Sequence, residues 1–245
     1  MSKIITTDAI QRHYQRDDVV SAYVAKRFRE PMGTLKHRIQ VGIINRVLGG
    51  IDYPIVLDLA CGPGRVSKDL QGVEHGVAAD ASPAMLREAR KVLGKQWTLQ
   101  EIDAFRLPFR KEQFEVVTSF RFIRHFNIEK RQQLYAQVRR VLKPKGYFIL
   151  DFLDKRTTRW LKIVGKHKYA VYDELYIPKQ FRKELADAGF EVVSVIPVVK
   201  HVFLQGVISK VSHFFYFWRF GWWSVRVLEK IPGTPWEWVA VCKKR

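Results

Sequence analysis

From residue 55 onward, short apolar runs alternate with segments whose apolar residues recur at helical spacing. Such runs, bounded by turn residues, are typical of buried strands, and the segments between them are typical of amphipathic helices. Strands are expected at 55–60, 77–79, 97–102, 114–120, 147–152, 191–199 and 236–242, and helices at 83–93, 129–142 and 178–188. This alternation predicts an α/β, doubly wound, Rossmann-like fold with a mostly parallel seven-stranded sheet and helices on both faces.

The rest of the chain is arranged around this sheet. Residues 17–48 have helical periodicity with one break at 30–33, which predicts two N-terminal helices. We therefore expect an N-terminal helical cap over 1–50 and a Rossmann-like, ligand-binding core over 51–155. Residues 156–245 would complete the same domain, with an aromatic, substrate-side insertion at about 200–232 before the last strand.

The cysteines predict neither a disulfide framework nor a metal site. Cys61 and Cys242 lie 181 positions apart and have no metal-ligand spacing. A chain of 245 residues with 47% apolar positions can close a core without either device. This cysteine usage is consistent with a reducing compartment, and we expect a cytoplasmic protein that holds no metal.

A glycine-rich turn follows the first expected strand. In the segment VLDLACGPGR (56–65), Gly62 and Gly64 stand between a strand and the residues that open the next helix. Glycines at such a place let the backbone approach a ligand closely and put helix N-terminal amides beside it. The alternative is an ordinary tight strand-to-helix turn with no ligand.

Two aspartates end the next two expected strands. Asp80 comes 16 residues after Gly64, where a carboxylate can accept hydrogen bonds from both hydroxyls of an adenosine ribose; alternatively it is only a helix N-terminal carboxylate. Asp103 follows the third strand, at the same sheet edge, within reach of an adenine amino group. A dinucleotide fingerprint would need a third glycine where this chain has Ser67, which disfavours a nicotinamide cofactor.

These residues resemble the class I S-adenosylmethionine-dependent methyltransferases over roughly residues 50–155, with LDLACGPGR (57–65) similar to their first motif and LKPKGYFILDF (142–152) to their passage into the fifth strand. The resemblance implies S-adenosylmethionine as cofactor and S-adenosylhomocysteine as product. It implies that Gly62 and Gly64 line the methionine part, Asp80 the ribose, Met85 one adenine face, and Asp103 with Ala104 the adenine edge. It also implies cofactor contacts for Asp58, Ala60, Ala81 and Phe120.

Within that family, EVVTSFRFIRHF (115–126) is most similar to the branch that methylates small molecules and quinone-type lipids, where a histidine often stands at the place of His125. Methyl transfer from a sulfonium is an in-line displacement, so alignment and exclusion of water do most of the work. A hydroxyl acceptor would also need a base, and an imidazole can take a proton near neutral pH. His125 is therefore the catalytic candidate; alternatively it only orders its loop.

The acceptor is left open by the sequence. Lys and Arg exceed Asp and Glu by 43 to 24, a formal net charge of +19 that favours anionic partners such as acidic lipid, a phosphorylated substrate or nucleic acid. An RNA acceptor remains an alternative, although no known RNA-binding module is recognisable and the loop after the fourth strand lacks the motif of base-methylating enzymes. A third hypothesis is a non-catalytic S-adenosylmethionine-binding module.

Segment 205–230, QGVISKVSHFFYFWRFGWWSVRVLEK, is the most unusual part of the chain, with six aromatic residues between positions 214 and 220. On one continuous helical projection, apolar and basic residues separate onto different faces, a pattern suited to an anionic membrane surface. The alternative is packing on the sheet or on a second subunit. The polar start of the chain and the lack of an apolar run of about 18 residues predict that it does not cross a membrane. We expect at most peripheral association, and the oligomeric state stays open.

Overall fold

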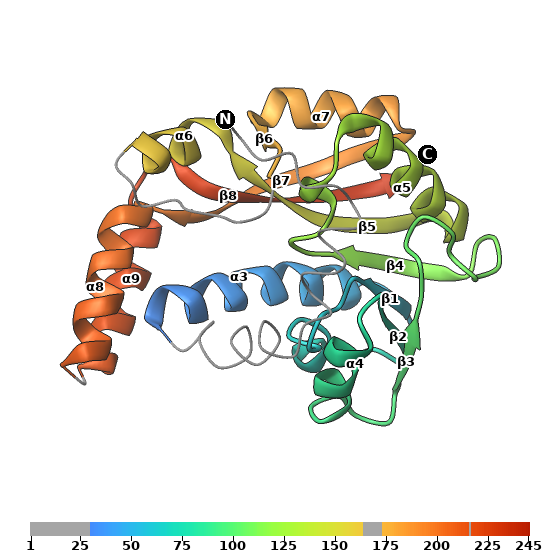
Figure 1. Cartoon of the computed structure of the whole chain (residues 1–245), viewed down its shortest axis with the longest axis horizontal. Coiled ribbons are helices and arrows are strands. Elements are labelled where there is room, and N and C mark those ends of the chain that lie inside the picture. Colours follow the sequence, from blue (N-terminus) through green and yellow to red (C-terminus); the bar gives the residue numbers. More distant parts are fainter. Residues whose placement is uncertain (1–29, 164–172, 216) are drawn as a thin grey trace.

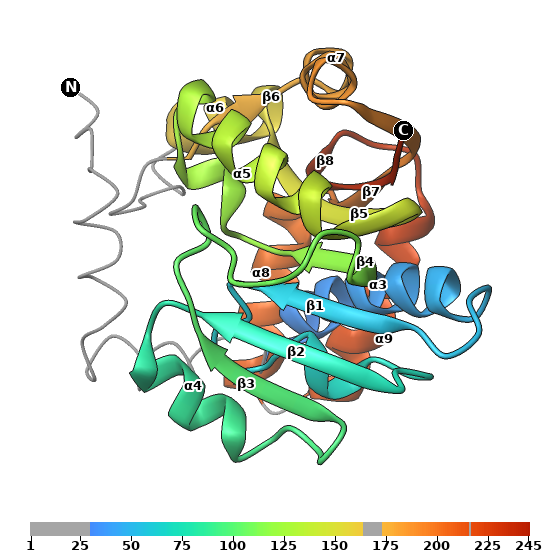
Figure 2. The same ribbon diagram turned by 90° about the vertical axis from the view of Figure 1, so that its right-hand side faces the viewer.

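The computed structural model describes residues 30–163, 173–215 and 217–245. One sheet runs in the order β3-β2-β1-β4-β5-β8-β7, and the short β6 pairs with β5 (Figures 1 and 2). The strands are β1 (Ile55–Leu59), β2 (His75–Asp80), β3 (Trp97–Glu101), β4 (Phe114–Ser119), β5 (Leu142–Asp154), β6 (Leu175–Tyr176), β7 (Phe190–Lys200) and β8 (Pro235–Lys244). Only β8 runs antiparallel to its neighbours, β5 and β7. The predicted doubly wound, mostly parallel fold is confirmed, with the two-residue β6 as an eighth strand too short to leave a periodic pattern.

The helices begin where local sequence favours a start. Proline occupies the first turn of three of them, and the side chains of Ser82 and Asn127 accept backbone N–H groups at the starts of two. The helices are α3 (Pro31–Leu48), α4 (Pro83–Arg90), α5 (Ile128–Val141), α6 (Lys155–Ile163), α7 (Pro178–Asp187), α8 (Val202–Phe214) and α9 (Trp218–Lys230), with 3-10 turns η1 (Ser67–Asp69) and η2 (Ile123–His125). The first predicted N-terminal helix lies outside the described residues.

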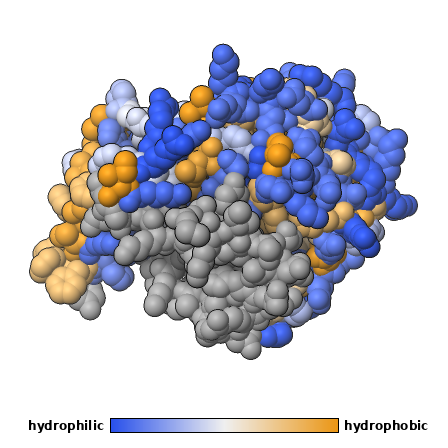
Figure 3. All heavy atoms as spheres, turned by 45° about the horizontal axis from the view of Figure 1, so that its top comes forward, coloured by the Kyte–Doolittle hydropathy of each residue, from blue (hydrophilic) through white to orange (hydrophobic). Residues whose placement is uncertain are grey.

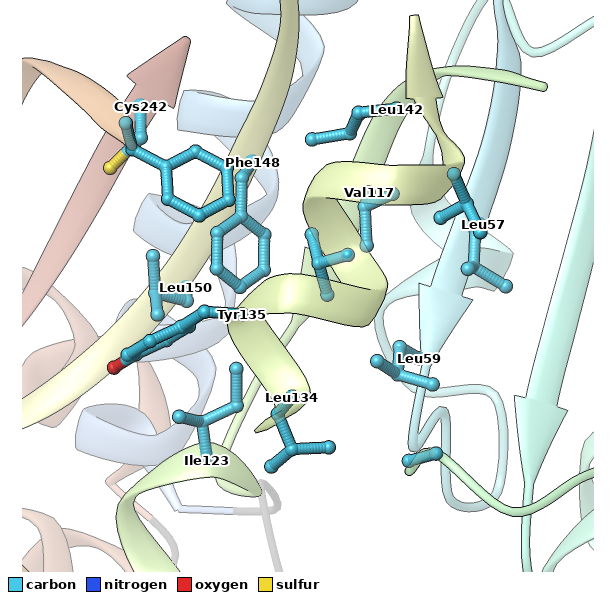
Figure 4. Close-up of a cluster of buried hydrophobic side chains, with 14 of the residues drawn as sticks. Leu57, Leu59, Val117, Ile123, Leu134, Tyr135, Leu142, Phe148, Leu150 and Cys242 are labelled. Carbon is cyan, nitrogen blue, oxygen red and sulfur yellow. The ribbon is translucent and has the colours of Figure 1, made fainter. Parts of the chain in front are cut away.

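Alternate residues of the central strands enter two separate cores, one on each face of the sheet. Leu57 and Leu59 of β1 belong with Leu134 and Tyr135 of α5 to one core, part of which Figure 4 shows. Val56, which immediately precedes Leu57, belongs to the other core with residues of α3. This period of two explains why the sheet is covered by helices on both sides.

The aromatic insertion is a helical hairpin, not the single helix of the sequence projection. Helix α8 ends at Phe214 and α9 begins at Trp218, so side chains that share one face on a continuous helix are distributed over two antiparallel neighbours. Gly221 lies inside α9, and the turn falls several residues earlier. Val225 of α9 is fully buried, whereas Val207, Val211 and Phe214 of α8 are exposed.

Candidate functional site

The site lies where the strand order of the sheet reverses. β1 pairs in parallel with β2 on one side and with β4 on the other, so the connections leaving β1 and β4 diverge at their carboxyl ends. In open α/β sheets this switch point is where ligands bind, because the diverging loops leave a crevice. The glycine turn follows β1 at this point and Phe120 follows β4.

The glycine turn has the backbone conformation that its sequence predicts. Ala60, Gly62 and Gly64 all have positive φ, of 59°, 56° and 73°. A Cβ on Gly62 would meet nothing within 4 Å, whereas one on Gly64 would lie 3.1 Å from Leu93 Cγ. Gly62 therefore borders open space at the carboxyl end of β1, and Gly64 allows close packing of the turn on the residues after α4. Ala60 adopts a conformation unfavourable for a residue with a side chain, and such strain is concentrated at functional sites.

Asp80 fixes the turn from the end of β2. Its Oδ2 accepts the Gly62 backbone N–H across 2.8 Å, and its Oδ1 accepts the Ser82 backbone N–H across 2.9 Å. Burial raises the pKa of Asp80 to about 6, although these two backbone donors favour the charged form. Each carboxylate oxygen retains capacity for a further donor, such as a ligand hydroxyl.

Asp58 supports the same turn from below. It is buried, and its two oxygens accept the hydroxyls of Ser67 and, across 2.8 Å, of Thr118. Burial raises the pKa of Asp58 above its ordinary value. Ser67 stands where a dinucleotide-binding fingerprint would have its third glycine. Its hydrogen bond to Asp58 links the residues after the glycine turn to β1. Phe120, after β4, is buried in the same core as Cys61 of the turn.

The predicted adenine-side residues lie along the ends of β2 and β3. The Ile102 N–H donates to the Asp80 carbonyl across 3.1 Å and so joins the ends of these strands. Asp103 is exposed and accepts the Phe105 N–H across 2.9 Å, while Ala104 beside it is buried. Ala81 is half-buried after Asp80, and Met85 is buried in the first turn of α4. These residues therefore border one stretch of the sheet edge next to the glycine turn.

His125 lies in η2, the short turn after β4, and is 7% exposed. Its Nδ1 is 3.1 Å from Oδ1 of Asp173, and the same oxygen is 3.0 Å from Nε of Arg124. Arg124 Nη1 also donates to Asp151 across 2.7 Å, and Asp151 accepts the Arg121 backbone N–H. The structure thus connects His125 to the end of β4 through a buried charged cluster.

That cluster extends to residues that the sequence analysis missed. Glu237 of β8 is fully buried; Lys36 and Gln40 of α3 donate to it, and Arg124 lies 3.4 Å away. Burial alone would raise the pKa of Glu237, but the opposing charges of Lys36 and Arg124 outweigh it and lower the pKa. These partners are up to 201 positions apart, so no local motif marks them. The only signal was the occurrence of charged residues within apolar strand and helix patterns.

Comparison with known proteins shows that a family model described as a methyltransferase domain matches residues 56–146. A demethylmenaquinone methyltransferase from Leptospira interrogans is 33% identical over 119 residues, covering 45% of this chain and 47% of the relative. A malonyl-[acyl-carrier protein] O-methyltransferase from Legionella pneumophila is 31% identical over 126 residues, covering 49% of this chain and 44% of the relative. The chain spans about half the length of the curated relatives it matches.

A solved structure has the same fold over most of both chains. Magnesium protoporphyrin IX methyltransferase from Synechocystis PCC 6803, with bound SAH, matches with a TM-score of 0.61 at 17% identity. The match covers 88% of this chain and 86% of that one. At this identity the likeness demonstrates a shared fold and not a shared activity, because one fold can host many activities.

Proposed function

We propose that this chain, whose residues 56–146 form a class I S-adenosylmethionine-dependent methyltransferase domain, transfers the methyl group of S-adenosylmethionine to a small-molecule or lipid-like acceptor. The observation that carries the proposal is the pairing of Asp80 with Gly62 at the switch point of the sheet. It combines an open backbone turn with a half-buried carboxylate that can accept further hydrogen bonds.

The residues at this edge fit the proposed cofactor. Gly62 provides open space where a side chain would intrude on a ligand, and Asp80 provides acceptors for the ribose hydroxyls. Asp103 presents an exposed carboxylate for the adenine amino group, with Ala104 beside it and Met85 toward an adenine face. Asp58 and Phe120 support the glycine turn and do not themselves contact the cofactor in this proposal. Asp58 already accepts two side-chain hydroxyls, and Phe120 is packed in the core.

S-adenosylmethionine supplies an electrophilic sulfonium methyl, which an acceptor nucleophile takes by in-line displacement. The protein must then align the acceptor, exclude water and, for a hydroxyl acceptor, remove a proton. We assign proton removal to Nε2 of His125, because its other ring nitrogen faces Asp173 at 3.1 Å. A carboxylate at Nδ1 fixes the orientation of the ring.

The acceptor class rests on two supports. The Leptospira relative is named a demethylmenaquinone methyltransferase, and the region that the family model matches includes the glycine turn after β1. The second support is the exposed apolar surface of α8 and α9, beside which a lipid-like acceptor can leave a membrane. We accordingly propose a cytoplasmic enzyme that works at a membrane surface. The net charge of +19 equally suits RNA, so RNA is the acceptor to test against.

Calorimetric titration with S-adenosylmethionine, comparing the wild type with Asp80→Ala, tests the cofactor. We expect saturable binding that the variant loses or weakens by at least about tenfold, since it removes a charged hydrogen-bond acceptor. Lys91→Ala, a change to an exposed residue at the C-terminal end of α4, is the matched control. No binding by the wild type would refute the assignment.

Transfer of a radiolabelled methyl group to a membrane-lipid extract or to total RNA then tests the acceptor. Label in the lipid fraction supports the proposal, and label in RNA overturns the acceptor class. Cofactor binding without methyl transfer to any of lipids, small-molecule extracts or RNA would favour a non-catalytic binding module.

A further inference from the structure

The α8–α9 hairpin has its polarity reversed relative to an ordinary surface hairpin. The buried residues of α8 are Gln205, Ser209 and Ser212, and those of α9 are Gly221 and Val225. Apart from Val225, small and polar side chains therefore form the seam. Trp218 and Trp222 are half-buried, whereas most of the other large apolar side chains, such as those of Phe203, Phe214 and Phe220, are exposed. In water an amphipathic helix buries its apolar stripe instead.

The seam is tightly packed and hydrogen-bonded. Ser209 Oγ accepts the Met32 backbone N–H across 2.9 Å, and Gln205 Nε2 donates to Glu229 across 2.8 Å. A Cβ on Gly221 would overlap the Ser212 side chain, so the two helices approach as closely as a glycine allows. Small residues at close helix contacts, joined by polar side chains, are typical of helices that pack in lipid.

The outward side chains form a continuous apolar surface, which we call the hairpin apron. Figure 3 shows apolar side chains gathered at the left edge of the molecule, where Figure 1 places the hairpin. Near the turn, Phe214 is 75% exposed and Phe217 and Phe220 are each 65% exposed. The ring of Phe203 contacts that of Trp160 of α6, with centroids 5.8 Å apart, which extends the surface. The hairpin apron comprises Trp160, Phe203, Leu204, Val207, Val211, Phe214, Phe215, Phe217, Phe220, Trp223 and Val227.

The charges beside the hairpin apron have one sign. Lys210, Arg219, Arg226 and Lys230 are exposed on the two helices. The sole acidic residue of α8 and α9 is Glu229, which is half-buried and accepts the Lys200 backbone N–H as well as Gln205. A partner of matching chemistry is therefore apolar in its interior and anionic at its surface. A bilayer with acidic head groups has this composition.

The lengths of the helices determine how such a bilayer would be met. Each has 13 residues, or about 20 Å at 1.5 Å per residue, which is less than a bilayer core of about 30 Å. Within the described ranges, no helix reaches the length and hydropathy of a membrane-crossing segment. Entry from one side, turn first, is the geometry that remains.

We propose that the α8–α9 hairpin inserts its aromatic turn into the anionic face of a lipid bilayer and anchors the enzyme there. The inference rests on the proposed function and deepens it, because a lipid-like acceptor would require the enzyme to work at a membrane. The apron residues enter the acyl-chain boundary, and the four basic residues bind acidic head groups. The Ser–Gly seam holds the two helices together in a medium where apolar burial cannot.

Flotation with vesicles tests the anchor. The wild type should float with equimolar phosphatidylcholine and phosphatidylglycerol, much less with phosphatidylcholine alone, and less as salt is added. The double variant Phe217→Ser/Phe220→Ser should lower the partition coefficient by at least about tenfold, since burial of each phenylalanine is favourable. Arg219→Glu should lower it on acidic vesicles only. Tyr53→Ser, which removes an aromatic that is 74% exposed outside the hairpin, should leave it unchanged.

Two further measurements exclude other occupants. Acyl-chain-brominated lipids should quench tryptophan fluorescence less in Trp223→Phe than in the wild type, whereas adsorption by charge alone would give no quenching in either. Light scattering should give a monomer without vesicles. A wild-type dimer that the double variant dissociates, with no flotation, would overturn the proposal in favour of self-association.

Failure of the anchor and failure of the methyltransferase assignment are separable. Calorimetry with S-adenosylmethionine and thermal unfolding are run on each hairpin variant, and both should match the wild type. Flotation that is unaffected by the double variant, with the fold intact, would overturn the anchor alone. Wild-type flotation without cofactor binding would instead leave the anchor standing and refute the proposed function.

Discussion

The Asp80 carboxylate accepts the Gly62 backbone N–H across 2.8 Å, and this hydrogen bond joins the end of β2 to the turn that follows β1. One side chain thereby sets the conformation of the glycine turn and offers acceptors to a ligand at the same place. Burial raises its pKa to about 6, so its protonation changes within an experimentally accessible range. Cofactor affinity and the stability of the ligand-free protein should therefore depend on pH with opposite signs.

The affinity for S-adenosylmethionine should fall as the pH decreases below about 6, because protonation removes acceptor capacity from Asp80. The dissociation constant should rise by up to about tenfold per pH unit, the limit for one linked proton. Calorimetry between neutral and acidic pH measures this, with Asp80→Asn as reference. An equally steep profile in the variant would assign the proton to another group.

The contribution of Asp80 to the stability of the ligand-free protein should have the opposite sign. Between its ordinary value of 3.8 and about 6, the folded protein retains a proton that the unfolded chain has lost. Unfolding then releases a proton, so stability decreases as the pH rises through this window. Denaturant unfolding of the wild type should show this decrease relative to Asp80→Asn, and a parallel pH course for the two proteins would contradict it.

Gly62→Ala and Gly64→Ala should separate ligand binding from folding. Both glycines have positive φ, which costs a residue with a Cβ about 1–2 kcal/mol. Only at Gly64 would the new methyl also press on Leu93, so Gly64→Ala should destabilise more. At Gly62 the methyl would enter open space on the ligand side, and cofactor affinity should fall further than stability does. The same ratio of affinity loss to stability loss in both variants would contradict the assignment of Gly62 to ligand binding and of Gly64 to folding.

His125→Gln should lower kcat by about 10²–10⁴-fold for a hydroxyl acceptor, the range of general acid–base catalysis, with little change in cofactor affinity. Asp173→Asn should act through the ring, since Oδ1 of Asp173 lies 3.1 Å from Nδ1 of His125. We expect a smaller kcat loss and a shifted pH–rate profile. Loss of cofactor binding in His125→Gln would instead indicate that the residue only orders its loop.

Local signals predicted which residues meet at one edge of the sheet, because these residues follow consecutive strands. Gly62, Asp80 and Asp103 could be placed at one edge since the carboxyl ends of parallel strands coincide. The buried charged cluster around His125 and Arg124 could not be assembled in this way. Glu237 meets Lys36 from the opposite end of the chain, and Asp173 reaches His125 from a segment without periodicity. The hairpin was misread as one helix because its turn has no proline or glycine between Phe214 and Trp218.

Glu237→Gln should destabilise the protein by about 3–5 kcal/mol, the usual effect of removing one partner from a buried ion pair. The carboxylate is fully buried and accepts hydrogen bonds from Lys36 and Gln40, so the variant leaves the lysine without its charge partner. Replacing Lys36 by Met in the same chain should restore part of the loss. Denaturant unfolding of the two single variants and the double variant measures the coupling, and additive effects would contradict a direct interaction.

Gly221→Ala and Gly206→Ala form a matched pair on the hairpin, since both glycines lie within helices. A Cβ on Gly206 meets nothing within 4 Å, so alanine there should stabilise by about 1 kcal/mol through helix propensity. A Cβ on Gly221 would overlap Ser212 and lie 3.2 Å from Pro31 Cγ. Overpacking costs about 1–3 kcal/mol and should outweigh the propensity gain, so that the melting temperature falls. Ser212→Gly in the same chain should recover part of that fall, because it removes the overlapping atoms. Stabilisation by both alanines would mean that the helices do not approach closely at Gly221, and the Ser–Gly seam would then have no physical basis.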